Sequence, residues 1–335
     1  MSEDVTILVA PRDRFSSVVD CARSIIENTE PGFRLVFLDL GYNHDTLSKL
    51  RDACRFAPTE IVSSGRTTPM IALRDYAGRI ATHFTVWVDN DTFVTRGWLS
   101  ALLARASQGA RVVLPVTLER EGLDSDPRAI PLRNHITHSE LRAVTVHGRD
   151  YLFDHKPFRR ASLEELPKEP HVVDFFELHA FFIETRVLQE LDLAPMVVRE
   201  HIDIGLQLHQ KGIPIWSEPR SVVIFDNIHT RPTRGDIAFF TFRWSERLID
   251  ESHDLFERRW GYRFYNERFL KNWAFRRRVF SWCRHLGVPQ GPADLASRVA
   301  VRLLSPRIPA EFVRDPLSAS RRVMGEVAAR ASARA

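Results

Sequence analysis

Two carboxylates one residue apart are the first feature of this sequence that could do chemistry: Asp89 and Asp91, in the segment THFTVWVDNDTFVTRGW. The apolar run 84–88 before them predicts a buried strand, because β-branched and aromatic residues dominate it and it is short for a helix. A third acid, Asp39, falls within a second predicted strand, 34–41, near its end. Because ligands of open α/β sheets bind beyond the carboxyl ends of the strands, we expect these acids to converge on one crevice.

The ligand expected for such a cluster of carboxylates is a hard divalent cation. Mg²⁺ and Mn²⁺ prefer oxygen ligands, and they commonly complete their coordination with phosphate oxygens. An acid-x-acid motif at a strand end therefore predicts a site for a metal and a diphosphate. The alternative is that Asp89-Asn90-Asp91 only forms a turn, since Asp and Asn favour turns. The motif alone does not decide between the two.

The elements that would position these acids alternate between strand and helix in the first half of the chain. This alternation predicts an α/β fold with a parallel sheet and helices on both faces. The expected strands are 5–10, 34–41, 60–64, 84–88 and 111–118, and the expected helices are 15–29, 45–54, 70–81 and 97–108.

The second half of the sequence is less regular. Residues 119–170 are rich in charge, His and Pro, and they predict an insertion or long loop beside a site. We expect a helix over 199–212, and then a short strand, a proline turn and a last strand over 214–229. From 236 onwards the aromatic and basic content rises and the pattern is helical.

Composition narrows the class of protein. A chain of 335 residues with 44% hydrophobic residues can bury a sizeable core, which argues against disorder. Its three cysteines are scattered without metal-ligand spacing, and their odd number disfavours a disulfide framework. The N-terminus does not have the pattern of a signal peptide, and no apolar run reaches the roughly 18 residues needed to span a bilayer. We therefore expect a cytoplasmic protein.

Charge is divided unevenly along the chain. Residues 231–335 contain 21 Lys and Arg against 11 Asp and Glu, a net charge of +10, whereas the remainder contains 26 against 32, a net charge of −6. A basic C-terminal region predicts an anionic partner, with membrane phospholipid and nucleic acid as the two candidates.

Four segments, in this order, resemble family 2 glycosyltransferases of the GT-A fold: VFLDLGYNHDT, IALRDYAGRIATHFTVWVDND, HAFFIETRVLQELD and REHIDIGLQLHQKGIPIWSEP. The resemblance covers residues 5–230. It implies a GT-A type, Rossmann-like, mostly parallel sheet flanked by helices, and the basic helical C-terminal region would be an extension of it. We assign 1–118 to the nucleotide-sugar half, 119–235 to the insertion and acceptor half, and 236–335 to the C-terminal region.

The reaction implied by this resemblance is transfer of a hexose or N-acetylhexosamine from a nucleoside-diphosphate sugar to an acceptor hydroxyl, with inversion. Such a reaction would serve polysaccharide or glycoconjugate synthesis. Asp89 and Asp91 would hold Mn²⁺ or Mg²⁺, and His229, after the last strand, would supply a further ligand. The residues implied to bind the donor are Asp39, Arg74, Asp89 and Asn90. The alternatives are that His229 is a surface histidine and that Arg74 is a solvated helix residue.

The catalytic base is expected at the start of the helix at 199. The family has a Glu-Asp pair where this chain has Glu200-His201, and Asp203 follows two residues later. We take Asp203 as the first candidate, Glu200 as the second, and His201 as the alternative, because an imidazole with a pKa near 6.5 also suits the task. Either acid could instead only cap the helix. Glu177 and His179 are expected on the acceptor side, although a histidine beside an apolar run is more often a core residue.

The partners implied are a nucleotide-sugar donor and a carbohydrate or lipid-linked acceptor. Residues 269–287, FLKNWAFRRRVFSWCRHLG, have the composition of an interfacial helix, which predicts peripheral contact with the anionic inner face of a membrane. The alternative is that these aromatic residues pack on the catalytic domain.

Other functions remain open from the sequence. A sugar-phosphate nucleotidyltransferase normally has a Gly-rich loop after its first strand, and VAPRDRFSS contains no glycine. A nucleic-acid-binding protein would explain the basic C-terminal region. The sheet half is acidic, however, and we expect no nucleic acid. A catalytically inactive binding module of the same fold is a further alternative.

Overall fold

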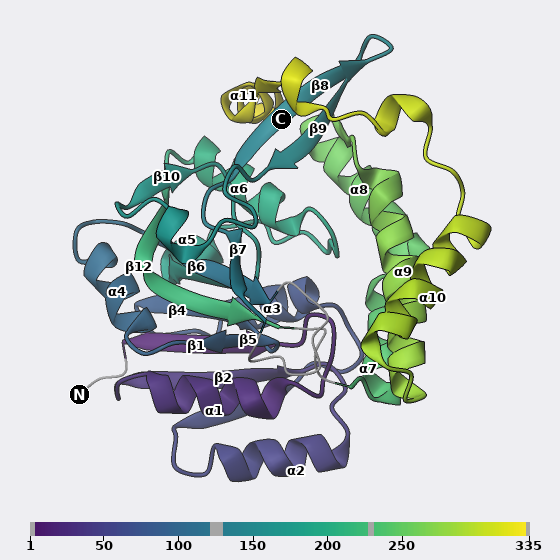
Figure 1. Cartoon of the computed structure of the whole chain (residues 1–335). Helices are drawn as coiled ribbons and strands as arrows, with labels where there is room; N and C mark the ends of the chain where they lie inside the picture. The colour runs from purple at the N-terminus through teal and green to yellow at the C-terminus, as the bar shows by residue number, and fades with distance from the viewer. Residues whose placement is uncertain (1–3, 121–129, 227–230, 333–335) are drawn as a thin grey trace.

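The centre of the molecule is a ten-stranded mixed sheet in a computed structural model that describes residues 4–120, 130–226 and 231–332 (Figure 1). The strand order is β10-β12-β6-β11-β4-β1-β2-β3, with β5 paired to β12 and β7 to β6. The strands are β1 (Val5–Ala10), β2 (Phe33–Asp39), β3 (Thr59–Ser63), β4 (Phe84–Asp89), β5 (Thr92–Val94), β6 (Val112–Arg120), β7 (Leu132–Ile136), β10 (His171–Val173), β11 (Ala180–Glu184) and β12 (Ile215–Phe225).

Helices cover both faces of this sheet. One face carries α1 (Val18–Asn28), α2 (His44–Ala53) and α4 (Trp98–Ala106), and the other carries α3 (Pro69–Ala77), α5 (Thr185–Gln189) and α6 (Glu200–Gln210). Along β1, Ile7 and Val9 pack under the first group, while Leu8 and Ala10 pack under the second. Two buried faces explain why the strands are continuous apolar runs, as is usual for parallel pairing. The expected α/β class is confirmed.

A second, four-stranded sheet lies beyond the main one, in the order β13-β9-β8-β14. Its strands are β8 (Glu140–Val146), β9 (Arg149–His155), β13 (Arg263–Phe264) and β14 (Arg321–Arg322). Of the two alternatives expected for 119–170, an insertion or a long loop, the long loop is wrong, since this stretch contains β7 and the β8–β9 hairpin. The hairpin turns at His147 and Gly148, both with positive φ, as a two-residue hairpin loop requires.

The proline turn expected within 214–229 is also absent. β12 is one strand, and its register against β6 shifts between Glu218 and Val222. Pro219 lies inside this irregularity, where its missing N–H costs no regular ladder hydrogen bond.

The C-terminal region is helical, as expected. It contains α7 (Arg234–Arg243), α8 (Glu246–Trp260), α9 (Glu267–His285), α10 (Gln290–Leu304) and α11 (Met324–Ser332). Helices α9 and α10 run side by side along one edge of the molecule, and α11 lies beside β8 (Figure 1). Phe240, Trp244 and Ala274 share a buried cluster with Val197 and Val198, so this region packs on the sheet domain.

Within the residues that the structure describes, no helix combines the length and the apolar character needed to cross a bilayer. The domain boundaries assigned from the sequence stay a prediction.

Candidate functional site

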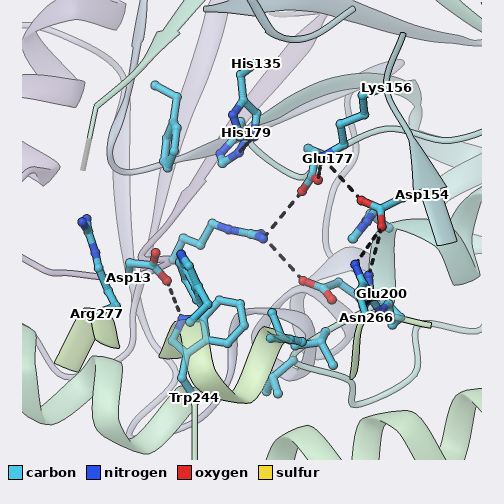
Figure 2. A pocket seen from close by; sticks show the side chains of 18 of the residues that line it. Asp13, His135, Asp154, Lys156, Glu177, His179, Glu200, Trp244, Asn266 and Arg277 are labelled. Carbon is cyan, nitrogen blue, oxygen red and sulfur yellow. Dashed lines mark hydrogen bonds and ion pairs between the residues drawn. The ribbon is translucent and has the colours of Figure 1, made fainter. Parts of the chain in front are cut away.

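A pocket of about 480 Å³ lies where the sheet domain, the β8–β9 hairpin and the C-terminal helices meet. Glu177, Lys156, Asp154 and Glu200 surround one part of it, and Trp244 and Asp13 lie on another side (Figure 2). The charged and imidazole side chains that line it are Arg12, Asp13, Glu119, His135, Asp154, Lys156, Arg159, Glu177, His179, Arg199, Glu200, His201 and Arg277.

Asp91 is fully buried after β4, and both of its carboxylate oxygens lack a hydrogen-bond partner among the described residues. Asp89 ends β4, and its Oδ1 accepts a hydrogen bond of 3.0 Å from the Trp87 indole. Burial raises the pKa of Asp91 well above its usual value and that of Asp89 to about 7, although the nearby Arg12 lowers the latter. An unpaired buried carboxylate is costly, so this pair is a candidate site for a cation.

His179 completes a set of ligands with these two acids. Its Nδ1 lies 3.3 Å from Oδ2 of Asp89, and the ligand atoms of Asp89, Asp91 and His179 all lie within 4.8 Å of one another. The two carboxylates suit a hard divalent cation, and the added imidazole favours a transition metal such as Mn²⁺ over Mg²⁺. The donor set therefore fits the expected metal, and it includes His179, which the sequence had placed on the acceptor side.

That other histidine, His229, lies outside the described residues, and its role stays a prediction. The preceding strand does reach the acids, because the backbone N–H of Asp226 donates to the carbonyl of Asp91 at 3.0 Å.

None of the four residues expected to bind the donor, Asp39, Arg74, Asp89 and Asn90, lines the pocket. Asp39 is buried at the end of β2, where its Oδ1 accepts from the N–H groups of two turn residues. The Nδ2 of Asn90 donates to the Arg14 carbonyl at 2.7 Å, which ties the loop after β1 to the end of β4. Arg74 is exposed on α3, with its Nε 3.2 Å from Asp75.

Glu200 and His201 line the pocket, and Asp203 does not. Oε1 of Glu200 lies 3.5 Å from the Arg243 guanidinium, while its Oε2 is buried without a hydrogen-bond partner in the described chain. Neither ring nitrogen of His201 has a hydrogen-bond partner among those residues either, and burial lowers its pKa.

Asp203 points away from the pocket. Its carboxylate accepts from the Trp260 indole at 2.8 Å and from Gln207 at 2.9 Å, and Arg259 lies 3.3 Å away. Burial raises its pKa to about 6, with Arg259 opposing the rise. Every oxygen of this carboxylate is thus engaged in packing α6 against α8, and the structure does not bring Asp203 together with Glu200 and His201.

Arg12 is a central residue that the sequence did not single out. Its guanidinium lies 3.5 Å from Asp89, 3.7 Å from Glu200 and 4.0 Å from Glu177. It thereby joins the end of β4, the start of α6 and the segment before β11. The sequence does contain a signal for Arg12, because this residue follows the first strand and ligands bind beyond the carboxyl ends of such strands.

Glu177 and His179, expected on the acceptor side, both line the pocket. Glu177 forms an ion pair with Lys156, which, with the neighbouring histidines, holds its pKa well below the usual value against the effect of burial. His135 places its Nε2 3.2 Å from Nε2 of His179. Lys156 and His135 come from the stretch expected to be a loop, so spacing alone could not place them.

The C-terminal region supplies one wall of the pocket. Phe269, Leu270, Trp273 and Arg277 of α9 line it together with Trp244. Trp273 packs edge-on against Trp244, with ring centroids 4.8 Å apart, yet 39% of its surface remains exposed. The aromatic residues of 269–287 are therefore partly used within the molecule.

Comparison of the sequence with protein-family models and with curated proteins gives no match. The fold, however, is similar to solved glycosyltransferases. GalNAc-T7 with UDP, GalNAc and Mn²⁺ aligns at 15% identity with a TM-score of 0.54, covering 90% of this chain and 56% of that chain. The mannosyltransferase PcManGT from Pyrobaculum calidifontis, in complex with GDP-Man and Mn²⁺, aligns at 16% identity with a TM-score of 0.50, covering 100% of this chain and 87% of that chain.

This chain thus spans little more than half the length of GalNAc-T7. At these identities the likeness concerns the fold, and the expected GT-A glycosyltransferase fold is confirmed.

Proposed function

We propose that this chain, which has the GT-A fold, is a metal-dependent glycosyltransferase that moves a sugar from a nucleoside-diphosphate sugar to an acceptor hydroxyl. The observation that carries the proposal is the buried set Asp89, Asp91 and His179, whose ligand atoms lie within 4.8 Å of one another beside a polar pocket. The neighbouring folds are named with Mn²⁺ and with UDP or GDP-Man, which supports the same chemistry here.

Asp89, Asp91 and His179 would hold Mn²⁺ or Mg²⁺, and the bound cation would neutralise the charge of the departing diphosphate. We assign a supporting role to Arg277 of α9, which lines the pocket. Burial and the neighbouring Arg14 lower its pKa to about 10, so it stays protonated at neutral pH. A half-buried guanidinium near the metal ligands suits a diphosphate, because it donates several hydrogen bonds in a fixed plane.

Glu200 is the base that we favour. Inverting transfer by a single displacement needs a group that takes the proton of the attacking hydroxyl. Oε2 of Glu200 is buried and has no hydrogen-bond partner in the described chain, while Arg243 and Arg12 lie near its Oε1 and fix its orientation. His201 beside it is the alternative, and Asp203 is disfavoured because its carboxylate faces α8.

A carbohydrate acceptor suits the wall formed by α9. Sugar rings have apolar faces that pack on aromatic side chains, and Phe269 and Trp273 expose 40% and 39% of their surfaces at this wall. Inversion, Mg²⁺ as an alternative metal, a role in polysaccharide or glycoconjugate synthesis and a cytoplasmic location stay predictions.

Binding of nucleotides with and without Mn²⁺ tests the proposal. Ligands that bind only the folded state raise its melting temperature by mass action. We expect UDP or GDP, and the corresponding nucleotide sugars, to raise the melting temperature only when Mn²⁺ is present. A shift produced by a nucleoside triphosphate and a sugar phosphate, but by no nucleotide sugar, would instead favour a nucleotidyltransferase.

A further inference from the structure

Large apolar side chains are exposed mainly in one part of this molecule. Thirteen of them are exposed among the residues that the structure describes, and ten of the thirteen lie between Phe269 and Leu317. Two of the ten, Phe269 and Trp273, line the pocket. The others have no such role, and an exposed apolar surface of this kind usually marks an interaction site.

Helix α10 concentrates this exposure on one stripe. Leu295, Val299 and Leu303 are spaced four residues apart and are 63%, 47% and 74% exposed. Ala293 and Ser297 are buried on the opposite side of the helix, which packs on α9. The stripe therefore faces away from α9, and Figure 1 shows α10 along the outer edge of the molecule.

The same two helices are strongly cationic. Residues 267–304, which span both helices, contain eight Lys and Arg against two acids, Glu267 and Asp294, a net charge of +6. Asp294 is already paired with Arg276 and Arg298. Arg298 and Arg302 flank the apolar stripe on α10 and are exposed. An apolar stripe bordered by arginines is the arrangement of a helix that lies in a lipid–water interface.

We infer that α10 docks this protein onto an anionic phospholipid membrane. Leu295, Val299 and Leu303 would enter the headgroup–acyl boundary, and Arg298 and Arg302 would extend to the lipid phosphates. The arginines are complementary in charge to any anionic partner. A nucleic acid would pair with the arginines but leave the aliphatic stripe in water, whereas an anionic membrane covers both. The helix differs from the one expected from the sequence, because α9 already uses Phe269 and Trp273 at the pocket.

The docking would also fix where the pocket lies relative to the membrane. Helix α9 contacts α10 and lines the pocket with Trp273, so α9 lies between the docked stripe and the pocket. The docking itself does not depend on the transfer reaction.

Flotation of the full chain with lipid vesicles tests the inference. We compare vesicles of phosphatidylcholine with vesicles in which phosphatidylglycerol replaces part of that lipid, without metal or nucleotide. The wild-type chain should float with the second kind only. Leu295→Gln/Val299→Gln/Leu303→Gln should reduce binding by about tenfold or more, because three apolar side chains no longer enter the interface. Arg298→Gln/Arg302→Gln should lose roughly fivefold for each charge.

Matched controls keep the test specific. Phe56→Gln removes an 89% exposed apolar residue that is far from α10 in the sequence, and Arg23→Gln removes an exposed charge on α1. Both variants should float like the wild type. All changes are at exposed positions, and circular dichroism should show unchanged helicity. Equal flotation of the triple variant and the wild type would overturn the inference. The inference would also be overturned if the wild type were a dimer in solution and the triple variant a monomer, because a second copy of the chain would then cover the stripe.

Discussion

The Nδ1 of His179 lies 3.3 Å from Oδ2 of Asp89, and neither atom has a hydrogen-bond partner among the described residues. Burial and the neighbouring His135 lower the pKa of His179 well below its usual value. A neutral imidazole offers a lone pair, and His135, 3.2 Å from its other nitrogen, can fix the orientation of the ring. An imidazole and two buried carboxylates that meet in this way are a more specific candidate for a metal site than the Asp-x-Asp motif alone.

Replacement of the metal ligands should remove the stabilisation by metal while changing little without it. Without metal, Asp91→Asn should alter the free energy of unfolding only slightly, because burial raises the pKa of Asp91 and already favours the neutral carboxyl. With Mn²⁺, the wild type should gain in melting temperature, whereas Asp91→Asn and His179→Ala should gain little. Differential scanning fluorimetry measures both effects. Asp75→Asn, at an exposed position on α3, is the control, and a full Mn²⁺ response in Asp91→Asn would contradict the assigned site.

Replacement of Glu200 and replacement of Asp203 should have clearly different effects on the turnover of transfer. Glu200→Gln should lower turnover by about a hundred- to ten-thousand-fold, the usual contribution of a general base. Asp203→Asn should retain most of the turnover, because its side chain faces Trp260 and Arg259 rather than the pocket. The measurement is turnover at saturating donor and acceptor for both variants. If Asp203→Asn is inactive while folded and Glu200→Gln is active, the order of the candidates given by the sequence is right.

The positions of strands and helices in the sequence were easier to predict than the directions of the side chains around the pocket. The apolar run before Asp89 and the helix from Glu200 are found to within two residues of their expected positions, because hydrophobic periodicity acts locally. The direction of Asp203 could not be predicted, since it depends on a contact with Trp260, 57 residues away along the chain. The same limit applies to Trp273, whose exposure at the pocket depends on how α9 docks.

The stability of the protein should depend on the protonation of Asp203. Its folded-state pKa of about 6 lies above its unfolded value, so the folded state binds the proton more tightly. The resulting stabilisation is fully present below about pH 4 and is lost as pH rises to about 6. Its size is on the order of 3 kcal/mol, since one pKa unit corresponds to about 1.4 kcal/mol. As pH rises between these values, the free energy of unfolding measured by urea denaturation should fall less, or rise more, in Asp203→Asn than in the wild type.

Asp192→Asn is the matched control for this experiment. Asp192 also contacts Arg259, at 2.9 Å, but 81% of its side chain is exposed. We expect its variant to keep the pH dependence of the wild type. An unchanged pH dependence in Asp203→Asn would contradict the assignment.

Gly205 should be intolerant of a side chain although it lies inside a helix. A Cβ at this position of α6 would come within 2.9 Å of the Asp174 carbonyl oxygen and of the Phe175 Cβ. Gly205→Ala would ordinarily stabilise a helix by about 1 kcal/mol. Here the overpacking should instead destabilise the protein by about 1–3 kcal/mol. Gly78→Ala, where a Cβ meets nothing within 4 Å, is the control, and chemical denaturation compares the two.

Trp273 should affect the acceptor rather than the donor. It is exposed on the α9 wall of the pocket, and a sugar ring can pack on its indole face. Trp273→Ala should raise KM for the acceptor roughly tenfold, because such a contact contributes about 1 kcal/mol or slightly more. KM for the donor should stay unchanged, since the metal ligands come from β4 and the segment before β11. Trp282→Ala, on the same helix and similarly exposed but outside the pocket, is the matched control. An equal rise in both KM values for Trp273→Ala, or the same acceptor effect in Trp282→Ala, would show that α9 only supports the fold.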